Sequence, residues 1–261
     1  VTGAARRIGA AIARRLHAAG ASVLLHYRGA EADAASLEAE LNALRAKSAS
    51  KVKADLLAPI APRVLVNASV ERFGRLDVLV NNAGINTFGP LAELPLDSLR
   101  EMLETNVLGL MTVTQAVFPH MADRRSGRIT NVGSAVGVLP TPFAGAYCAS
   151  KSAVHMLSEV LRMEAKAFGI EVIVVQPGAV RSSIADSGAR GLERYRAETS
   201  RYHRANAGIE KRAYASQDNP MEAEEFAREM ITQAFATPAP RLVRLGNGAD
   251  GVIRLAELPG E

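Results

Sequence analysis

Tyr147 and Lys151 stand four residues apart in the sequence Tyr-Cys-Ala-Ser-Lys. On a helix this spacing puts both side chains on one face, one turn apart. A phenol with its ordinary pKa of about 10 is a poor acid or base at neutral pH, and a neighbouring ammonium group lowers that pKa. The pair therefore predicts a general acid–base group, although a Tyr–Lys pair taken alone is more often a matter of chance.

Ser134 follows the apolar run 128–132, which has the composition of a buried strand. In an open α/β sheet, ligands bind at the carboxyl ends of the parallel strands. The sequences Asn81-Asn82-Ala83-Gly84 and Pro177-Gly178 end two further apolar runs, and we expect them at the same edge. A serine hydroxyl there can polarise a substrate carbonyl, but strand-end turns rich in Asn, Gly and Pro are common and each is weak evidence alone.

A glycine-containing turn opens the chain, in the sequence Thr-Gly-Ala-Ala-Arg-Arg-Ile-Gly at residues 2–9. Only Val1 stands where a strand should lead into it. Gly3 permits a tight strand-to-helix turn, and Gly9 permits close packing of helix and strand. The helix N-terminus then offers free N–H groups to a pyrophosphate. An ordinary turn with two glycines explains this segment equally well.

The end of the next candidate strand bears on the choice of cofactor. An NAD site usually carries an Asp or Glu there for the ribose 2′-hydroxyl, whereas this chain has His26-Tyr27-Arg28. Arg28 can bind a 2′-phosphate through charge-assisted hydrogen bonds, and Arg6 and Arg7 can approach from the glycine turn. We therefore predict NADP(H) rather than NAD(H). The alternative is that these arginines are solvated surface groups.

Apolar β-branched runs alternate with amphipathic stretches, which predicts βα units and a doubly wound, Rossmann-type parallel sheet with helices on both faces. No linker or repeat interrupts the pattern, so residues 1–261 are predicted to form one domain. Residues 182–220 lack a clear period and are predicted to form a substrate lid. The predicted strands are 22–27, 51–55, 77–81, 128–132, 171–176 and 241–245, and the predicted helices are 9–19, 31–47, 62–73, 97–118, 147–168 and 221–236.

In this order, the glycine turn, Asn-Asn-Ala-Gly, Asn106, Ser134, Tyr-x-x-x-Lys and Pro-Gly resemble the short-chain dehydrogenase/reductase family over essentially the whole chain. The resemblance implies about seven strands in the order 3-2-1-4-5-6-7. It also implies that Tyr147 is the acid–base group and that Ser134 binds the substrate carbonyl. Lys151 would tune Tyr147 and bind the cofactor ribose, and Asn106 would hold a water that relays protons to Lys151.

The same resemblance assigns the cofactor contacts. Asp55 and Leu56 would lie at the adenine, residues 82–84 at the adenosine ribose, and residues 177–180 with Ser182 at the nicotinamide. The predicted NADP(H)-binding residues are Gly3, Arg6, Arg7, Ile8, Gly9, Tyr27, Arg28, Asp55, Leu56, Asn82, Ala83, Gly84, Tyr147, Lys151, Pro177, Gly178, Val180 and Ser182.

Two subfamilies are suggested by different parts of the chain. Residues 2–9 with 24–28 are similar to pteridine reductases, which use NADPH but carry an Asp at the position of Ser134. From about residue 75 the chain resembles reductases of lipophilic ketones, including hydroxysteroid dehydrogenases and acyl-dihydroxyacetone-phosphate reductases, on residues 150–155, 161–164, 175–179 and 244–248. We expect an NADPH-dependent oxidoreductase acting on a lipophilic or bulky ketone or aldehyde. A pteridine reductase and a non-catalytic NADP(H) sensor are the alternatives.

Composition narrows the range of partners. Lys and Arg number 31 against 27 Asp and Glu, a net charge of +4, with an isoelectric point of about 9.4. Residues 1–75 hold 12 basic and 6 acidic side chains, so the basic excess lies in the half predicted to bind the cofactor. Aromatic residues make up only 5% and there is no Trp, which argues against nucleic-acid binding. No apolar run approaches the roughly 18 residues of a membrane span.

The remaining expectations concern location, assembly and the lid. A single cysteine, Cys148, fits a reducing compartment, and we expect a cytoplasmic protein. The five histidines have no metal-ligand spacing, so no metal is expected. By resemblance, helices 97–118 and 147–168 would pair in a homodimer or homotetramer.

Residues 190–212 carry seven basic and three acidic side chains. They form either a solvated face, the commoner case, or a lid whose Arg194, Arg201 and Arg204 attract an anionic substrate.

Overall fold

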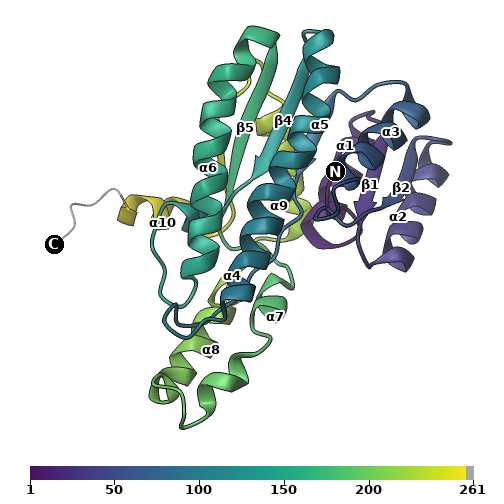
Figure 1. The fold of residues 1–261 in the computed structure, drawn as a ribbon. Coiled ribbons are helices and arrows are strands. Elements are labelled where there is room, and N and C mark those ends of the chain that lie inside the picture. Colours follow the sequence, from purple (N-terminus) through teal and green to yellow (C-terminus); the bar gives the residue numbers. More distant parts are fainter. Residues whose placement is uncertain (257–261) are drawn as a thin grey trace.

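The computed structural model describes residues 1–256, and Figure 1 shows strands and helices alternating along them. Within these residues six strands form two parallel sheets. One sheet pairs β1 (Val23–Tyr27) with β2 (Ala49–Lys53). The other has the order β3-β4-β5-β6, made of β3 (Val78–Asn81), β4 (Gly127–Val132), β5 (Ile170–Pro177) and β6 (Leu242–Leu245). The six predicted strands are therefore all present.

Residues 2–4 lie between the two sheets and hydrogen-bond to both. The Thr2 amide donates to the Val80 carbonyl at 3.0 Å, and the Ala4 amide donates to the His26 carbonyl at 2.8 Å. The spatial order therefore matches the expected 3-2-1-4-5-6-7. Within residues 1–256 the strands are assigned to two sheets rather than the expected single sheet of about seven strands, and residues 1–4 bridge them.

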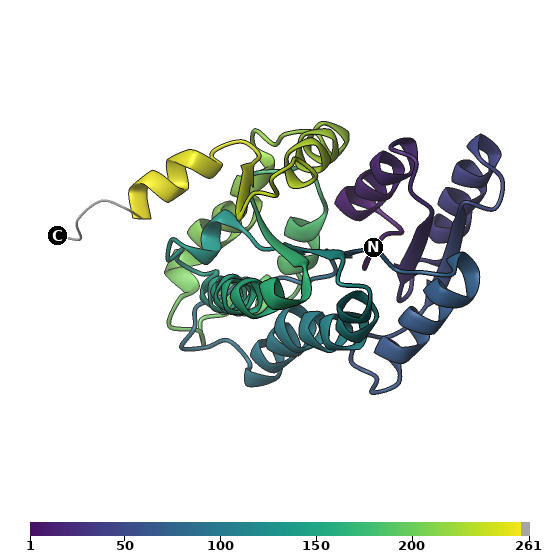
Figure 2. The ribbon, with the colours of Figure 1, turned by 90° about the horizontal axis from the view of Figure 1, so that it is seen from above.

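Helices cover both faces, which confirms the predicted doubly wound α/β fold (Figure 2). On one face α1 (Arg7–Ala18), α2 (Glu31–Leu44) and α9 (Ala223–Ala234) pack side chains such as Ile12, Leu41 and Phe226 against the sheets. On the other, α3 (Ala61–Phe73), α5 (Gly109–Asp123) and α6 (Gly145–Ala165) pack against β3, β4 and β5, with Met121 and Ile129 fully buried. Burial of these apolar faces positions the strand ends.

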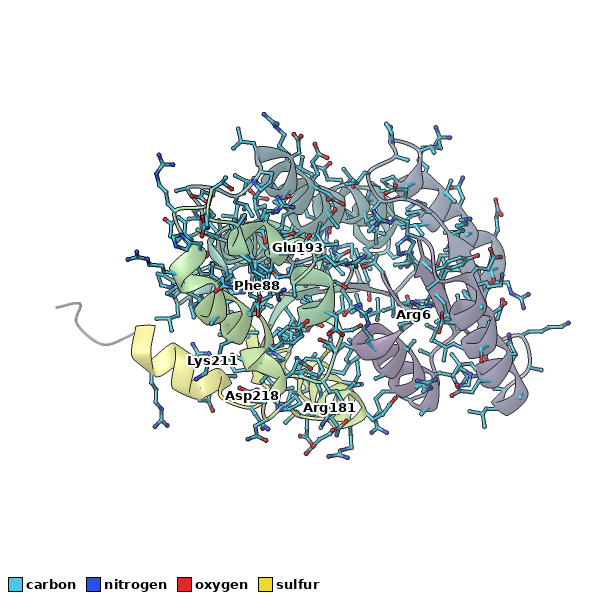
Figure 3. The ribbon with its side chains drawn as sticks, turned by 90° about the horizontal axis from the view of Figure 1, so that it is seen from below. Arg6, Phe88, Arg181, Glu193, Lys211 and Asp218 are labelled. Atoms are coloured by element: carbon cyan, nitrogen blue, oxygen red, sulfur yellow. The ribbon has the colours of Figure 1, made fainter. Side chains whose placement is uncertain are left out.

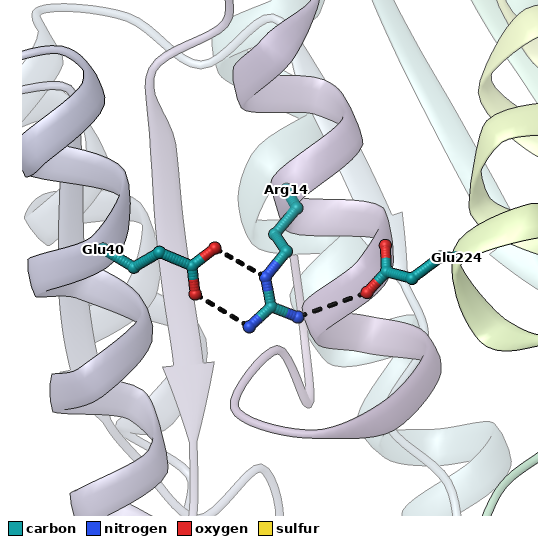
Figure 4. A network of polar contacts seen from close by, with 3 residues as sticks. All are labelled: Arg14, Glu40 and Glu224. Atoms are coloured by element: carbon teal, nitrogen blue, oxygen red, sulfur yellow. Dashed lines mark hydrogen bonds and ion pairs between the residues drawn. The ribbon is translucent and has the colours of Figure 1, made fainter.

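Arg14 links three helices of the first layer (Figure 4). Its guanidinium donates two hydrogen bonds to the Glu40 carboxylate, both at 2.8 Å, and a third to Glu224 at 3.3 Å. The side chain is 40% exposed, so the pairs contribute little individually to stability. The exposed side of α1 thus carries an ion-pair network that joins α1 to α2 and α9.

A π-helical turn interrupts the helix predicted at 97–118. The structure has α4 (Leu96–Leu103), a π turn at Glu104–Leu108 and then α5. Asn106 lies in the middle of this turn and is 1% exposed. Such turns widen a helix by one residue and are frequent at functional sites.

The 182–220 segment, predicted as an aperiodic lid, is built of short helices at the lower end of the view in Figure 1. It contains α7 (Ile184–Gly188) and α8 (Asn206–Tyr214) with several 3₁₀ turns. Leu192, Tyr195 and Ile209 form a hydrophobic cluster with Phe88 and Cys148. Helices of one or two turns bury too few side chains to produce a visible period. The final helix, α10, spans Ala249–Ala256.

None of the helices within residues 1–256 combines the length and the apolar character that a bilayer crossing requires.

Candidate active site

A cavity of about 720 Å³ opens at the carboxyl ends of β1, β3, β4 and β5. It is bordered by the glycine turn at one end and by the 182–220 segment at the other. Every predicted cofactor-binding residue lines this cavity, and so does Ser134. Asn106 does not line it. The structure thus brings together side chains that are up to 179 positions apart in the sequence, between Gly3 and Ser182.

Ser134 and Tyr147 both line the cavity wall, and the Ser134 side chain is near enough to shift the pKa of Tyr147. Ser134 follows β4 and caps a short 3₁₀ turn, its oxygen accepting a hydrogen bond from the Val136 amide at 3.4 Å. Tyr147 lies in the first turn of α6. The Ser134 amide also donates to Nε2 of His155 at 3.3 Å, so α6 holds the serine backbone as well as the tyrosine.

Burial raises the pKa of Tyr147 to about 12, while the Ser134 side chain acts in the opposite direction. Lys151 is not among the groups that shift this pKa, and its predicted lowering of the Tyr147 pKa stays a prediction. The Lys151 ammonium donates to the Val132 carbonyl at 2.9 Å and lies 5.6 Å from the centre of the Tyr147 ring. Desolvation of the phenol therefore dominates, and the phenol is protonated at neutral pH.

Lys151 itself is 5% exposed, and burial lowers its pKa to about 8. It stands beneath Gly84, where a Cβ would lie 3.6 Å from the lysine nitrogen and 3.2 Å from Oδ1 of Asn106. The absence of a side chain at Gly84 keeps this part of the cavity floor open.

Asn106 supports the floor from behind. Its Oδ1 accepts from the Ile85 amide at 2.8 Å, and its Nδ2 donates to the Ile85 carbonyl at 2.9 Å and to the Ser150 hydroxyl at 3.0 Å. Both side-chain N–H groups are thus used within the protein. Its predicted role in holding a proton-relay water stays a prediction. Any such water must be held by groups other than these two N–H groups.

The glycine turn depends on a histidine that sequence reasoning missed. The Gly3 amide donates to Nδ1 of His26 at 3.0 Å, and the other ring nitrogen lies 3.0 Å from the Ala54 carbonyl. The proton must therefore sit on Nε2, and burial lowers the pKa of His26 to about 4, which keeps the ring neutral. At Gly9 a Cβ would overlap the Gly3 carbonyl oxygen, so only glycine fits there.

The three arginines predicted to meet a 2′-phosphate differ in their surroundings. The Arg6 guanidinium donates to Asp33 of α2 at 2.7 Å and is therefore already paired. Burial lowers the pKa of Arg7, and the adjacent Arg6 charge adds to that effect. Arg28 is exposed and lines both this cavity and a smaller one of about 260 Å³. The acid that neutralises Arg6 comes from a different helix, which local sequence reasoning could not reveal.

The basic residues of 190–212 also separate into groups. Arg190 and Arg194 line the smaller cavity, and Arg201 and Arg204 line neither. Arg212, which sequence reasoning did not single out, is the basic residue of this stretch that lines the main cavity.

Comparison with known proteins settles the family. A family model described as short chain dehydrogenase matches residues 1–191. The chain belongs to the short-chain dehydrogenase family. Within this family it is 38% identical over 180 residues to an uncharacterised oxidoreductase of Methylorubrum extorquens, which covers 69% of this chain and 71% of that protein. It is 36% identical over 189 residues to dehydrogenase/reductase SDR family member 7B of Bos taurus, which covers 70% of this chain and 58% of that protein.

The chain spans less than two thirds of the length of the vertebrate family member 7B proteins that it matches. Among solved short-chain dehydrogenases, one from Streptomyces avermitilis superimposes with a TM-score of 0.81 at 29% identity, over 97% of this chain and 89% of that one. A Burkholderia phymatum protein in complex with NAD has a TM-score of 0.83 at 24% identity, over 99% and 90%. A Sphingobium yanoikuyae protein in complex with NADPH has a TM-score of 0.75 at 24% identity, over 94% and 85%. These last two show the shared fold.

Proposed function

We propose that this short-chain dehydrogenase interconverts a ketone or aldehyde and the corresponding alcohol with NADP(H), using Tyr147 as the acid–base group. The proposal rests on the placement of the Ser134 and Tyr147 hydroxyls, which lie close together and line the same cavity as the glycine turn. A carbonyl oxygen placed against both hydroxyls accepts two hydrogen bonds, which stabilise the negative charge that develops on it during reduction. Apolar side chains at the far end of the cavity, including Phe88 and Leu139, support a lipophilic or bulky substrate.

The residues of the cavity fit a dinucleotide cofactor. Gly3, Gly9 and Gly84 line the cavity, so a ligand there meets backbone rather than side chains. Residues 82–84 and 177–180 with Ser182 line the part of the cavity that would hold the two ribose rings and the nicotinamide. When bound, NADPH supplies the hydride that reduces the carbonyl carbon.

Arg28 favours NADP(H) over NAD(H). It follows Tyr27 at the end of β1, and within residues 1–256 no carboxylate lies within ion-pair distance of it. A planar guanidinium suits the 2′-phosphate that distinguishes the two cofactors. Family members with solved structures hold either cofactor, NAD in the Burkholderia protein and NADPH in the Sphingobium protein, so the preference rests on this residue.

Proton transfer then follows from the pKa values. Because burial holds the pKa of Tyr147 at about 12, the phenol carries its proton at neutral pH and can give it to the reduced oxygen. The Lys151 ammonium, which lies 5.6 Å from the centre of the ring, stabilises the phenolate left behind. For alcohol oxidation the phenol must first lose its proton, so that direction is favoured by high pH.

The test is cofactor oxidation against a panel of aliphatic, steroidal and aromatic ketones and aldehydes, with NADPH and NADH in parallel. Tyr147→Phe should lower kcat by at least about 100-fold. Arg28→Ala should raise the KM for NADPH by about 10-fold or more and leave that for NADH nearly unchanged. Arg15→Ala, an exposed arginine outside the cavity, is the matched control and should change neither.

Turnover that survives in Tyr147→Phe contradicts the assigned acid. NADPH binding without reduction of any carbonyl by the wild type favours a non-catalytic sensor. A pteridine reductase is disfavoured because Ser134, not an acid, faces Tyr147.

The helices expected to pair two copies leave apolar side chains exposed. On the α4–α5 connection and α6, the exposed fractions are 57% for Leu108, 67% for Met156 and 62% for Met163. Surface of this kind marks an interaction site. We infer that these helices form the contact of a homodimer or homotetramer.

A further inference from the structure

Arg212 lies at the end of the main cavity where the substrate would bind. Its helix, α8, is held by Ile209 and Ala213, which share a hydrophobic cluster with Phe88, Ala144 and Cys148. Cys148 follows Tyr147 directly in α6, so α8 is packed beside the acid–base group rather than beside the glycine turn. Figure 3 labels Lys211 on the same helix and Phe88 within the cluster; Lys211 is exposed, whereas Arg212 is half-buried and lines the cavity.

The charge of Arg212 is not neutralised within the part of the chain that the structure describes. Glu210, the acidic residue of α8, pairs instead with Arg196 at 2.7 Å. Burial lowers the pKa of Arg212, and the group that acts against that effect is Cys148 rather than a carboxylate. A guanidinium stays charged in proteins all the same. A partly desolvated cation that faces a cavity without a partner is a strong site for an anion, because the desolvation cost has already been met by folding.

The surroundings of this cation narrow the class of anion. The cavity wall includes the apolar side chains of Phe88, Leu139 and Ile184, together with the polar Ser216 and Gln217 that follow Arg212 in the chain. The other arginines of the cavity, Arg6, Arg7 and Arg28, come from the glycine turn and the end of β1. One planar guanidinium matches the two oxygens and the single charge of a carboxylate, whereas a phosphate dianion carries a second negative charge that one guanidinium leaves uncompensated.

We propose that Arg212 binds a carboxylate on the substrate, which is therefore a carbonyl compound with an apolar body and an acidic group. The turnover of such a substrate rests on the proposed function, whereas the binding of its carboxylate to Arg212 does not.

The kinetic test uses methyl-ketone carboxylic acids with two, four and six methylene groups between ketone and carboxylate, together with the matching primary amides. The wild type should prefer at least one acid over its amide. Arg212→Met should lower kcat/KM for that acid by about 10- to 100-fold, mainly through KM, and change the amide by less than about threefold. Arg212→Lys should retain part of the preference. Lys211→Met, which removes an equal charge outside the cavity, is the control and should leave the preference intact.

The binding test separates this inference from the proposed reaction. The same keto acids are titrated into the protein loaded with NADP⁺, a combination in which no hydride can be transferred, and the heat of binding is measured. Binding of an acid that is weakened in Arg212→Met but not in Lys211→Met supports the inference even if no carbonyl is turned over.

Three results overturn it. One is equal affinity of the wild type for acids and amides, and another is unchanged acid binding in Arg212→Met. The third is a raised Kd for NADP⁺ in Arg212→Met with equal losses on acids and amides, because Arg212 would then serve the cofactor diphosphate. If the protein binds acids better than amides but does not turn them over, only the proposed reaction is contradicted.

Discussion

Replacing Lys151 by methionine should abolish activity and yet make the cofactor-free protein more stable at neutral pH. Burial lowers the pKa of this lysine from 10.5 to about 8. At about 1.4 kcal/mol for each pKa unit, keeping the ammonium charged inside the fold costs about 3 kcal/mol. Methionine has a similar length and no charge, so the substitution removes that cost.

One loss offsets part of the gain. The ammonium donates a hydrogen bond to the Val132 carbonyl at 2.9 Å, and losing this bond to a charged group costs about 2 kcal/mol. The net expectation is that Lys151→Met raises the free energy of unfolding by about 1 kcal/mol, which in a protein of this size raises Tm by about 2–4 °C.

The pH dependence identifies the cause. Because the folded-state pKa lies below the unfolded value, the unfolded chain binds more protons between pH 8 and 10.5, and wild-type stability should rise through that range relative to the variant. Urea unfolding of both proteins at pH 7 and pH 10, without cofactor, measures the difference. Lys166→Met, at an exposed lysine, is the control and should show no such trend. A variant that is less stable at pH 7, or a difference that does not shrink by pH 10, refutes the reasoning.

Three further predictions concern the proton, the glycine turn and the assembly. The rate of alcohol oxidation should increase with pH up to at least pH 10, because the pKa of Tyr147 is about 12, whereas the rate of carbonyl reduction should not. Profiles of kcat/KM against pH, measured in both directions, test this prediction. Equal profiles in the two directions count against it. Gly9→Ala should destabilise the fold by about 2 kcal/mol or more and weaken cofactor binding, because its Cβ overlaps a backbone oxygen; an unchanged Tm and Kd would contradict that. Met156→Asp combined with Met163→Asp should yield monomers by light scattering, and an unaltered mass would place the contact elsewhere.

Much of the fold could be predicted from the sequence, because each buried parallel strand corresponds to a short run of apolar residues. All six predicted strands are present, with small shifts at their ends, and the order of the motifs indicated the family. Between the two sheets, residues 1–4 hydrogen-bond to both neighbours, at the place where only Val1 precedes the glycine turn.

The sequence predicted residues that the fold brings to one cavity, but it did not reveal their electrostatics. The spacing of Tyr147 and Lys151 placed them on one face of α6, but spacing does not reveal burial, and burial decides both pKa values. Nor does a local sequence show that Arg6 pairs with Asp33, or that Arg212 lines the cavity. These facts depend on how separate helices pack.

The two ends of the 182–220 segment lie side by side. The Arg181 amide donates to the Met221 carbonyl at 2.9 Å, and the Met221 amide donates to the Ala179 carbonyl at 3.0 Å. A segment with adjoining ends can be exchanged as a unit, because a replacement of different length has almost no gap to close. A replacement must still pack against Phe88 and against Cys148 of α6, which share a hydrophobic cluster with the segment. Tyr147 and the glycine turn lie outside it. Replacement of the 182–220 segment could thus change the substrate while Tyr147 and the glycine turn stay the same.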